Sequence, residues 1–250
     1  NGVGGGTEGV QIAGLLNANR GPTHGAQLAG MMNFNWNDSH DFAGAGLVNF
    51  FYRDSRGVKI AGMSNITVGE QQGPHIAGLF NFTMGDVAKA QVAGTLNFSA
   101  GEIDGVQVSG LLNVAPKKIR GAQIGLVNYA TRVKGSQIGF LNVADSMKGV
   151  TVGFLSFVNR GYHKLEVSAD EIFYTNLSFR TGVHQFYNIF TVGAKPNTFD
   201  DGQNPYWTFG YGFGTSPRLS RKLYLNFDLT ANQIMNGVSW DYINLLNKLY

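Results

Sequence analysis

The chain has no cysteine, few charged residues and no long apolar run, and each absence narrows what it can be. Without cysteine, neither a disulfide framework nor a Cys-ligated metal site can form. Charged residues make up 14% of the 250 residues, and a net charge of +3 gives no reason to expect nucleic acid as a partner. Because no run of 18 apolar residues exists, the sequence predicts no transmembrane helix.

What the sequence has in excess is glycine, 35 of 250 residues, and most of it belongs to one repeated phrase. The phrase is Gly-x-Gln-φ-Ala-Gly-φ-φ-Asn, where φ is apolar, and ten copies of it or of a close variant lie within residues 9–157. Its asparagines recur at sixteen residues six times, then at fifteen and fourteen. They are Asn17, Asn33, Asn49, Asn65, Asn81, Asn97, Asn113, Asn128 and Asn142, with Ser156 in the tenth copy.

This period predicts an all-β fold: a β-solenoid of about ten 14–16-residue rungs, followed by an antiparallel, aromatic-rich β-sheet region. Helical-pair repeats need more than about thirty residues, and glycine and β-branched residues disfavour helix. The alternative is an antiparallel meander, which would place the asparagines at opposite ends in turn and leave their identity unexplained. We therefore expect a solenoid over residues 1–160, and an antiparallel β cap or partial barrel-like region over residues 161–250.

Stacked rungs explain why the asparagine and the glycine before it hardly vary. Equivalent residues would lie about 4.8 Å apart, so the amides can form a hydrogen-bonded ladder at a corner. Glycine suits a corner with positive φ or close backbone approach, and the last three copies, one residue shorter there, require a bend. We expect the apolar residues after each asparagine and after each Gln position to fill the interior. These residues are Phe34, Phe50, Ile66, Phe82, Phe98, Val114, Tyr129, Val143 and Phe157, with Ile12, Leu28, Ile60, Ile76, Val92, Val108, Ile124, Ile138 and Val152.

The second half reads as amphipathic strands over residues 163–181, 184–193, 206–214 and 221–231, with a further strand-like stretch at the end. In the third of these, Trp207, Phe209 and Phe213 alternate with small or polar residues. Capping of the solenoid is the simpler interpretation, and membership of a longer assembly is the alternative. The opening "NGVGGG", without Met, indicates a mature or trimmed product.

These units resemble the surface-repeat proteins of Bacteroidetes-type and related bacteria, which carry the same phrase. The resemblance covers residues 9–157, and residues 161–182 also resemble the segment after the repeats in those proteins. It implies an envelope location at the outer membrane and carries no activity with it. The matching Gln positions are Gln11, Gln27, Gln91, Gln107, Gln123 and Gln137, whereas Ala43, Lys59, His75 and Thr151 depart from the pattern.

No constellation predicts a catalytic, cofactor or metal site. His75 stands at a Gln position, where a solvated or ladder-bonded histidine is expected. Asp38, His40 and Asp41 lie in one turn and could ligate a metal, but a solvated turn is the favoured interpretation. Sequons at three ladder asparagines are by-products of the repeat, because a buried amide cannot be glycosylated. They begin at Asn65, Asn81 and Asn97.

The turns between rungs should stack along one edge, and their charges are segregated. Glu70, Asp86, Glu102 and Asp104 come first along the chain. A basic stretch comes next, opposed only by Asp145, which we call the basic edge. It could meet an acidic protein surface, an anionic glycan or a lipid headgroup, but a charged edge that keeps the rod soluble and discourages sideways pairing is the favoured interpretation. The basic edge contains Lys117, Lys118, Arg120, Arg132, Lys134, Lys148 and Arg160.

Taken together, the sequence predicts a non-enzymatic repeat protein of a bacterial cell envelope, at the outer membrane or its periplasmic face. It would serve as a scaffold, an accessory or occluding subunit docked to an outer-membrane protein complex, with no nucleic acid bound. The alternative is a glycan-binding or polysaccharide-active solenoid. Binding would use Trp36 and Tyr52, and cleavage would need Glu102 with Asp104 or Asp86.

Overall fold

The computed structural model describes residues 2–170, 173, 175–195, 206–220, 223–236 and 245–249. Every regular element in these ranges is a β-strand, and none of them contains a helix able to cross a membrane. The chain divides into two compact units, residues 1–149 and 150–250. The first is a parallel β-solenoid and the second is built on an antiparallel sheet, as the sequence predicts.

The solenoid strands are short at first and longer after residue 112. They are β1 (Gly2–Val3), β2 (Thr7–Ala13), β3 (Leu16–Asn19), β4 (Thr23–Ala29), β5 (Met32–Asn35), β6 (Phe42–Ala45), β7 (Val48–Phe51), β8 (Ser55–Arg56), β9 (Lys59–Ala61), β10 (Ser64–Thr67), β11 (Gln71–Gln72), β12 (His75–Ala77), β13 (Phe80–Thr83), β14 (Val87–Ala93), β15 (Leu96–Ser99), β16 (Ile103–Ser109), β17 (Leu112–Ile124), β18 (Val127–Ile138) and β19 (Leu141–Val152), which continues past residue 149.

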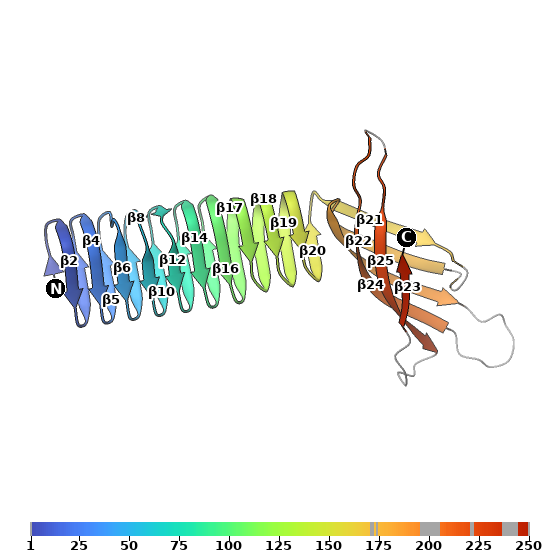
Figure 1. Cartoon of the computed structure of the whole chain (residues 1–250), viewed down its shortest axis with the longest axis horizontal. Coiled ribbons are helices and arrows are strands. Elements are labelled where there is room, and N and C mark those ends of the chain that lie inside the picture. Colours follow the sequence, from blue (N-terminus) through green and yellow to red (C-terminus); the bar gives the residue numbers. More distant parts are fainter. Residues whose placement is uncertain are drawn as a thin grey trace. The chain divides into compact units, whose positions relative to one another are not determined.

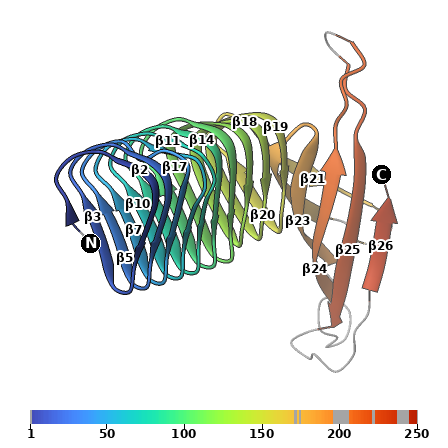
Figure 2. The same cartoon turned by 60° about the vertical axis from the view of Figure 1, so that its left-hand side comes forward.

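Each rung pairs in parallel and in register with the next, so every residue lies over its equivalent sixteen, fifteen or fourteen positions on (Figure 1). Asn33, for example, pairs with Asn17 on one side and with Asn49 on the other. Strands β3, β5, β7, β10 and β13 stack into one wall, and β2, β4, β6, β9 and β12 into another (Figure 2). The solenoid prediction is therefore confirmed, and the meander is excluded.

The glycine before each asparagine lies at the bend between the two walls, where the backbones of successive rungs are closest. A Cβ on Gly62 would stand 2.0 Å from the carbonyl oxygen of Gly46, so close approach is what requires glycine here. The shortened copies lose their residue at this same bend, Gly125–Leu126 in the eighth rung. Both neighbours of Gly125 remain outside, so the expectation that a bend absorbs the missing residue is confirmed.

The interior is polar, and our expectation that the large apolar side chains fill it is wrong. The ladder asparagines are fully buried, while Ile12, Leu28, Ile60 and Ile76 are 41–66% exposed. Phe34 and its equivalents after each asparagine also point outward, at least partly exposed. Strand alternation is the reason: when the asparagine faces inward, the residue after it must face outward.

Along the rod toward residue 149, the inward-facing residues of the polar turns become apolar. The position held by Thr23 and Ser39 in early rungs is held by Val87, Ile103 and Ile119 in later ones. A second inward position is asparagine in the first rungs, then Phe51, then threonine or serine, and alanine from Ala115 on. The rod thus has a small mixed core beside two columns of amides.

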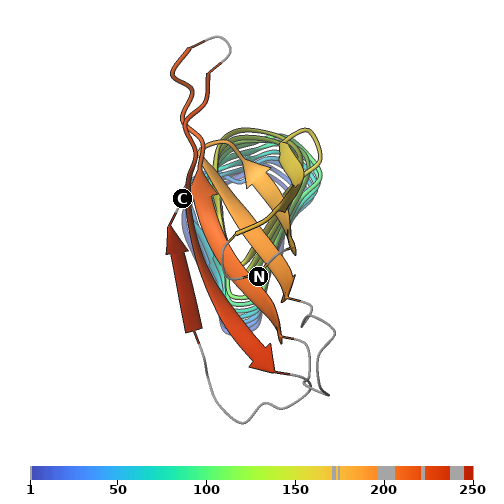
Figure 3. The same cartoon turned by 90° about the vertical axis from the view of Figure 1, so that its right-hand side faces the viewer.

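The second unit contains β20 (Leu155–Val158) and a six-stranded antiparallel sheet in chain order (Figure 3). Its strands are β21 (Tyr162–Ser168), β22 (Thr175–Val183), β23 (Phe186–Lys195), β24 (Tyr206–Thr215), β25 (Phe227–Asn236) and β26 (Leu245–Leu249). The segment expected as 163–181 is two strands, and the one expected at 221–231 begins only at Phe227. Asn188 of β23 ties the sheet to β20 by accepting from the backbone N–H of Ser156 at 2.9 Å.

Candidate functional site: an apolar ridge and a basic edge

The asparagine column is an unbroken chain of hydrogen bonds. Each Nδ2 donates to the Oδ1 of the next rung, as from Asn81 to Asn97 at 2.9 Å and from Asn97 to Asn113 at 3.0 Å. The same Nδ2 also donates to a backbone carbonyl across the bend, 2.7 Å away at Val108 for Asn97. Because an amide both donates and accepts, identical amides can satisfy one another through the whole stack. Asn17 to Asn142 are all linked in this way.

A second amide column runs beside it at the Gln position. Gln107, Gln123 and Gln137 each donate to the glutamine before them at 2.8–2.9 Å. The column is interrupted in the middle rungs by Ala43, Lys59 and His75, which all face inward. His75 is fully buried and bonds to the Ser55 hydroxyl at 3.0 Å, so it takes part in the interior network.

Lys59 is the one cation among the fully buried side chains of the described residues. Its Nζ donates to the Ser39 hydroxyl at 3.1 Å and to the Asp41 carbonyl at 3.2 Å, and it lies 5.1 Å from the centre of the Phe51 ring. No carboxylate among the described residues pairs with it. Burial therefore lowers the pKa of Lys59 to about 7. Burial, and then the neighbouring Lys59, hold the pKa of His75 well below its ordinary value.

The apolar residues that the sequence placed inside instead form a continuous outer surface, which we call the apolar ridge. Its crest is the residue after each bend glycine, and its two sides are the outward residues of the two walls. The crest holds Leu15, Met31, Leu47, Met63, Leu79, Thr95, Leu111, Leu126 and Phe140. The sides hold Ile12, Leu28, Ile60, Ile76, Val92, Val108, Ile124 and Ile138, and Ala18, Phe34, Phe50, Ile66, Phe82, Phe98, Val114, Tyr129 and Val143.

The apolar ridge carries no exposed charge over nine rungs. In each of the nine rungs, the segment that forms the ridge runs from the Gln position to the residue after the asparagine. The only charged residue within these segments is Lys59, whose side chain points into the core. The crest is well exposed, with Leu15 at 68%, Leu111 at 51% and Phe140 at 55%. A contiguous apolar surface of this extent is rare on soluble monomers and marks an interaction surface.

The structure brings the six basic-edge residues of the first unit together on the opposite side of the rungs. Lys118 pairs in register with Arg132, and Arg120 with Lys134, so these four side chains form two adjacent columns. Lys148, which precedes the glycine stacked on Gly135, continues the second column. Lys117 lies in the same turn as Lys118 and is exposed. The seventh residue of the basic edge, Arg160, belongs to the second unit.

Ion pairs neutralise the part of the basic edge that borders the acidic turns. Arg120 lies 3.3 Å from Asp104, and Lys118 lies 3.7 Å from Glu102. Within the described ranges, the other members in the first unit form no ion pair. These are Lys117, Arg132, Lys134 and Lys148. The unneutralised positive charge is therefore concentrated in the last three rungs before residue 150.

The remaining sequence candidates have structural roles. Asp41 accepts from the backbone N–H of Gly25, and Asp38 from that of Asp54, while His40 stacks on His24 with ring centres 4.3 Å apart. In the part of the chain that the structure describes, no three His, Asp or Glu side chains gather as metal ligands. The three sequon asparagines are fully buried in the ladder, which agrees with the interpretation that they are by-products.

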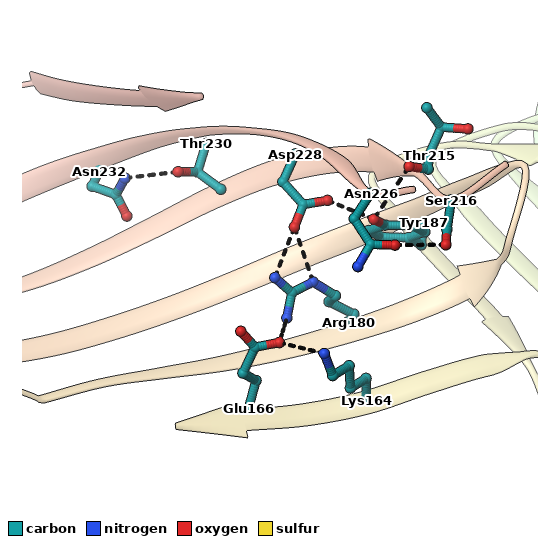
Figure 4. A network of polar contacts seen from close by, with 10 residues as sticks. All are labelled: Lys164, Glu166, Arg180, Tyr187, Thr215, Ser216, Asn226, Asp228, Thr230 and Asn232. Carbon is teal, nitrogen blue, oxygen red and sulfur yellow. Dashed lines mark hydrogen bonds and ion pairs between the residues drawn. The ribbon is translucent and has the colours of Figure 1, made fainter. Parts of the chain in front are cut away.

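The sheet of the second unit has the same arrangement, with polar residues on its covered face and apolar ones exposed. Arg180 lies between two carboxylates, donating to Asp228 at 2.7 Å and to Glu166 at 2.6 Å, while Lys164 also contacts Glu166 at 2.7 Å (Figure 4). Tyr187 donates to the second oxygen of Asp228 at 2.5 Å. The bond from Lys164 is the main reason that the pKa of Glu166 is lowered.

This network lines a cavity of about 320 Å³ bounded by β21, β22, β23, β25 and β26. Its charges are neutralised within the network: Arg180 and Lys164 against Glu166 and Asp228, and Lys248 against Asp170. Burial, and then the bond to Asp228, raise the pKa of Tyr187. The arrangement is that of a buried structural network, which fixes the strands against one another.

Tyr187→Phe tests that structural role. The substitution removes one donor from Asp228, which is only 3% exposed, and leaves its bonds to Arg180. We expect the free energy of unfolding to fall by about 1–3 kcal/mol, the cost of a buried acceptor that loses a partner. Urea unfolding monitored by circular dichroism measures it. Tyr52→Phe, at a side chain that is 54% exposed, should change stability by less than about 0.5 kcal/mol.

Sequence reasoning missed the apolar ridge although its residues were identified. Alternation shows which residues share a face, but it does not show which face is inside. The signal that could have decided it is the predicted asparagine ladder itself, because a buried asparagine requires the residue after it to face outward. Comparison with protein-family models, curated proteins and solved structures finds no match for this chain.

Proposed function

We propose that the protein is a non-enzymatic scaffold of a bacterial cell envelope, held at the outer membrane by its apolar ridge beside a protein complex to which it is accessory. The observation that carries this is the ridge itself: nine rungs of exposed apolar side chains without one exposed charge. Such a surface is costly in water, and it is accounted for when a partner covers it.

The alternative of a polysaccharide-cleaving solenoid has less support. Cleavage needs two carboxylates free to act as acid and as base or nucleophile. Glu102 is engaged by Lys118 and Arg120, and Asp104 by Arg120. Asp86 accepts from the backbone N–H of Glu102 at 2.7 Å, which makes it part of the turn.

Leu111→Asp tests the proposed function in the native host. A charge at the crest of the ridge should move most of the protein from the membrane-containing fraction to the soluble one, at least a tenfold shift in the ratio. Met84→Asp is the matched control, because Met84 is 50% exposed, like Leu111 at 51%, but lies in a polar turn outside the ridge. Quantitative immunoblots of the two fractions give the ratio. Retention of Leu111→Asp in the membrane fraction would contradict the proposal.

A further inference from the structure

We infer that the occupant of the apolar ridge is the acyl-chain layer of a lipid membrane, which the rod enters crest first. The inference rests on the proposed function and names the partner of the same surface. It is carried by the shape of the ridge, by the hydrogen bonding of its backbone and by the position of the unpaired basic residues.

The ridge is convex. Its crest lies at the bend, and its sides face away from each other on the two walls (Figure 2). A flat protein surface, or the equally convex ridge of a second copy, can cover one side and leaves the other in water. Acyl chains close around a protruding shape and cover the crest and both sides together. The exposure of Leu111 at the crest and of Ile124 and Tyr129 on the two sides fits that kind of partner.

The backbone N–H groups of the crest meet their share of the main requirement for entry into lipid, that polar backbone groups have partners inside the protein. Amides at the bend, which in most turns bind water, donate here to the preceding rung. The N–H of Met63 donates to Leu47 at 2.9 Å, and that of Leu79 to Met63 at 2.9 Å. The N–H of Leu111 donates to Thr95 at 3.2 Å. Apart from Thr95 at the crest, the polar side chains of these segments point into the core, where the ladders pair the amides.

When the crest is inserted, the basic edge lies just above the lipid headgroups, close enough to be attracted by their charge. Lys134 precedes the crest residue Phe140 by six residues of extended chain, about 20 Å at 3.3 Å per residue. Interfacial insertion of about 5–10 Å, with a headgroup layer of roughly 5–7 Å, leaves Lys134 within a Debye length of the anionic groups. Arg132, Lys134 and Lys148 have no ion-pair partner among the described residues, so their positive charge attracts anionic headgroups. The acidic turns of the earlier rungs oppose this attraction, so we expect anionic lipid to strengthen binding only moderately.

The second unit shows, by itself, the same exterior. Leu165 and Val167 of β21 are 67% and 72% exposed, Val192 of β23 is 54% exposed and Phe213 of β24 is 46% exposed. The opposite face of that sheet carries the ion network of Figure 4, in which Arg180 and Asp228 are buried. The two units differ in topology, yet both place polar groups inside and apolar groups outside. An apolar solvent favours that arrangement.

The test uses the purified full chain and vesicles of phosphatidylcholine, alone or with phosphatidylglycerol. Because the chain has no cysteine, Leu111→Cys and Met84→Cys each accept one environment-sensitive fluorophore at a defined place. We expect the protein to float with both kinds of vesicle, with a few-fold gain from phosphatidylglycerol. The label at position 111 should shift to the blue and be quenched by nitroxide-bearing acyl chains, while the label at position 84 keeps its aqueous emission.

Three outcomes overturn the inference. In the first, the protein fails to float with either vesicle, and in the second, both labels respond alike. In the third, the label at position 111 is already shielded without vesicles while light scattering reports a dimer, which identifies a second copy as the occupant. If the vesicle test fails but Leu111→Asp still releases the protein from the envelope, the proposed function stands and the occupant of the ridge is a protein. Circular dichroism of each labelled variant confirms that the rod is folded.

Discussion

Lys59→Gln raises the free energy of unfolding by roughly 4 kcal/mol at pH 7, and the gain shrinks to nearly nothing as the pH approaches 10.5. The reason is the buried ammonium, whose pKa falls to about 7 in the folded rod from its ordinary value of 10.5. Between these two values the unfolded chain binds a proton that the folded chain does not. Stability therefore rises with pH over this interval, by about 1.4 kcal/mol per unit. Below pH 7 both states are protonated and the cost of burial levels off.

The measurement is urea unfolding of the natural chain and of Lys59→Gln at pH 6, 7, 8 and 9. The difference between the two should be largest at pH 6 and 7 and should decline at pH 8 and 9. Glutamine is the chosen replacement because it is neutral and is the usual residue at this position of the repeat, although its neighbours in the column here are Ala43 and His75. Lys134→Gln removes an exposed lysine and should show no such pH dependence. Equal stability of Lys59→Gln and the natural chain at pH 7 would contradict the assigned cost of burial.

The architecture was predictable from the sequence because a solenoid is determined by period and by fixed residue types. Asparagines at constant spacing require stacking in register, and the glycines beside them require a bend with close backbones. The antiparallel strands were predictable from alternation, as in β24, where Trp207, Phe209 and Phe213 point outward. Strand ends were less predictable, because the polar turns contain residues that extend β17 and β18 through the whole turn.

The direction of the faces was not predictable from hydrophobicity, because the rule that apolar residues lie inside is what this protein reverses. An amide column can be buried because each asparagine finds in the next rung the hydrogen-bond partner that water would otherwise provide. The ion pairs of Arg120 and Lys118 with the acidic turns depend on register between rungs, and the sequence shows that register only once the solenoid is accepted. The buried network around Arg180 joins side chains 48 residues apart, for which no local pattern exists.

Asn97→Leu should lower the free energy of unfolding by about 3–5 kcal/mol. Leucine has a similar volume, but it makes none of the bonds of the amide. Asn81 loses an acceptor at 2.9 Å, and Asn113 loses a donor at 3.0 Å. The carbonyl of Val108 loses a donor at 2.7 Å. Each buried group left without a partner costs about 1–3 kcal/mol, and Asn81 and Asn113 are fully buried.

The first member of the ladder provides the comparison that isolates cooperativity. Asn17 donates to Asn33 at 2.9 Å, but its own Oδ1 has no partner among the described residues, so Asn17→Leu breaks one ladder bond where Asn97→Leu breaks two. We expect the loss at position 17 to be about half that at position 97, measured by urea unfolding and by hydrogen exchange of the flanking rungs. Equal losses at both positions would mean that shape rather than the amide chain sets stability. A larger loss at position 97, with faster exchange on both sides of it, would establish that the ladder carries stability from rung to rung.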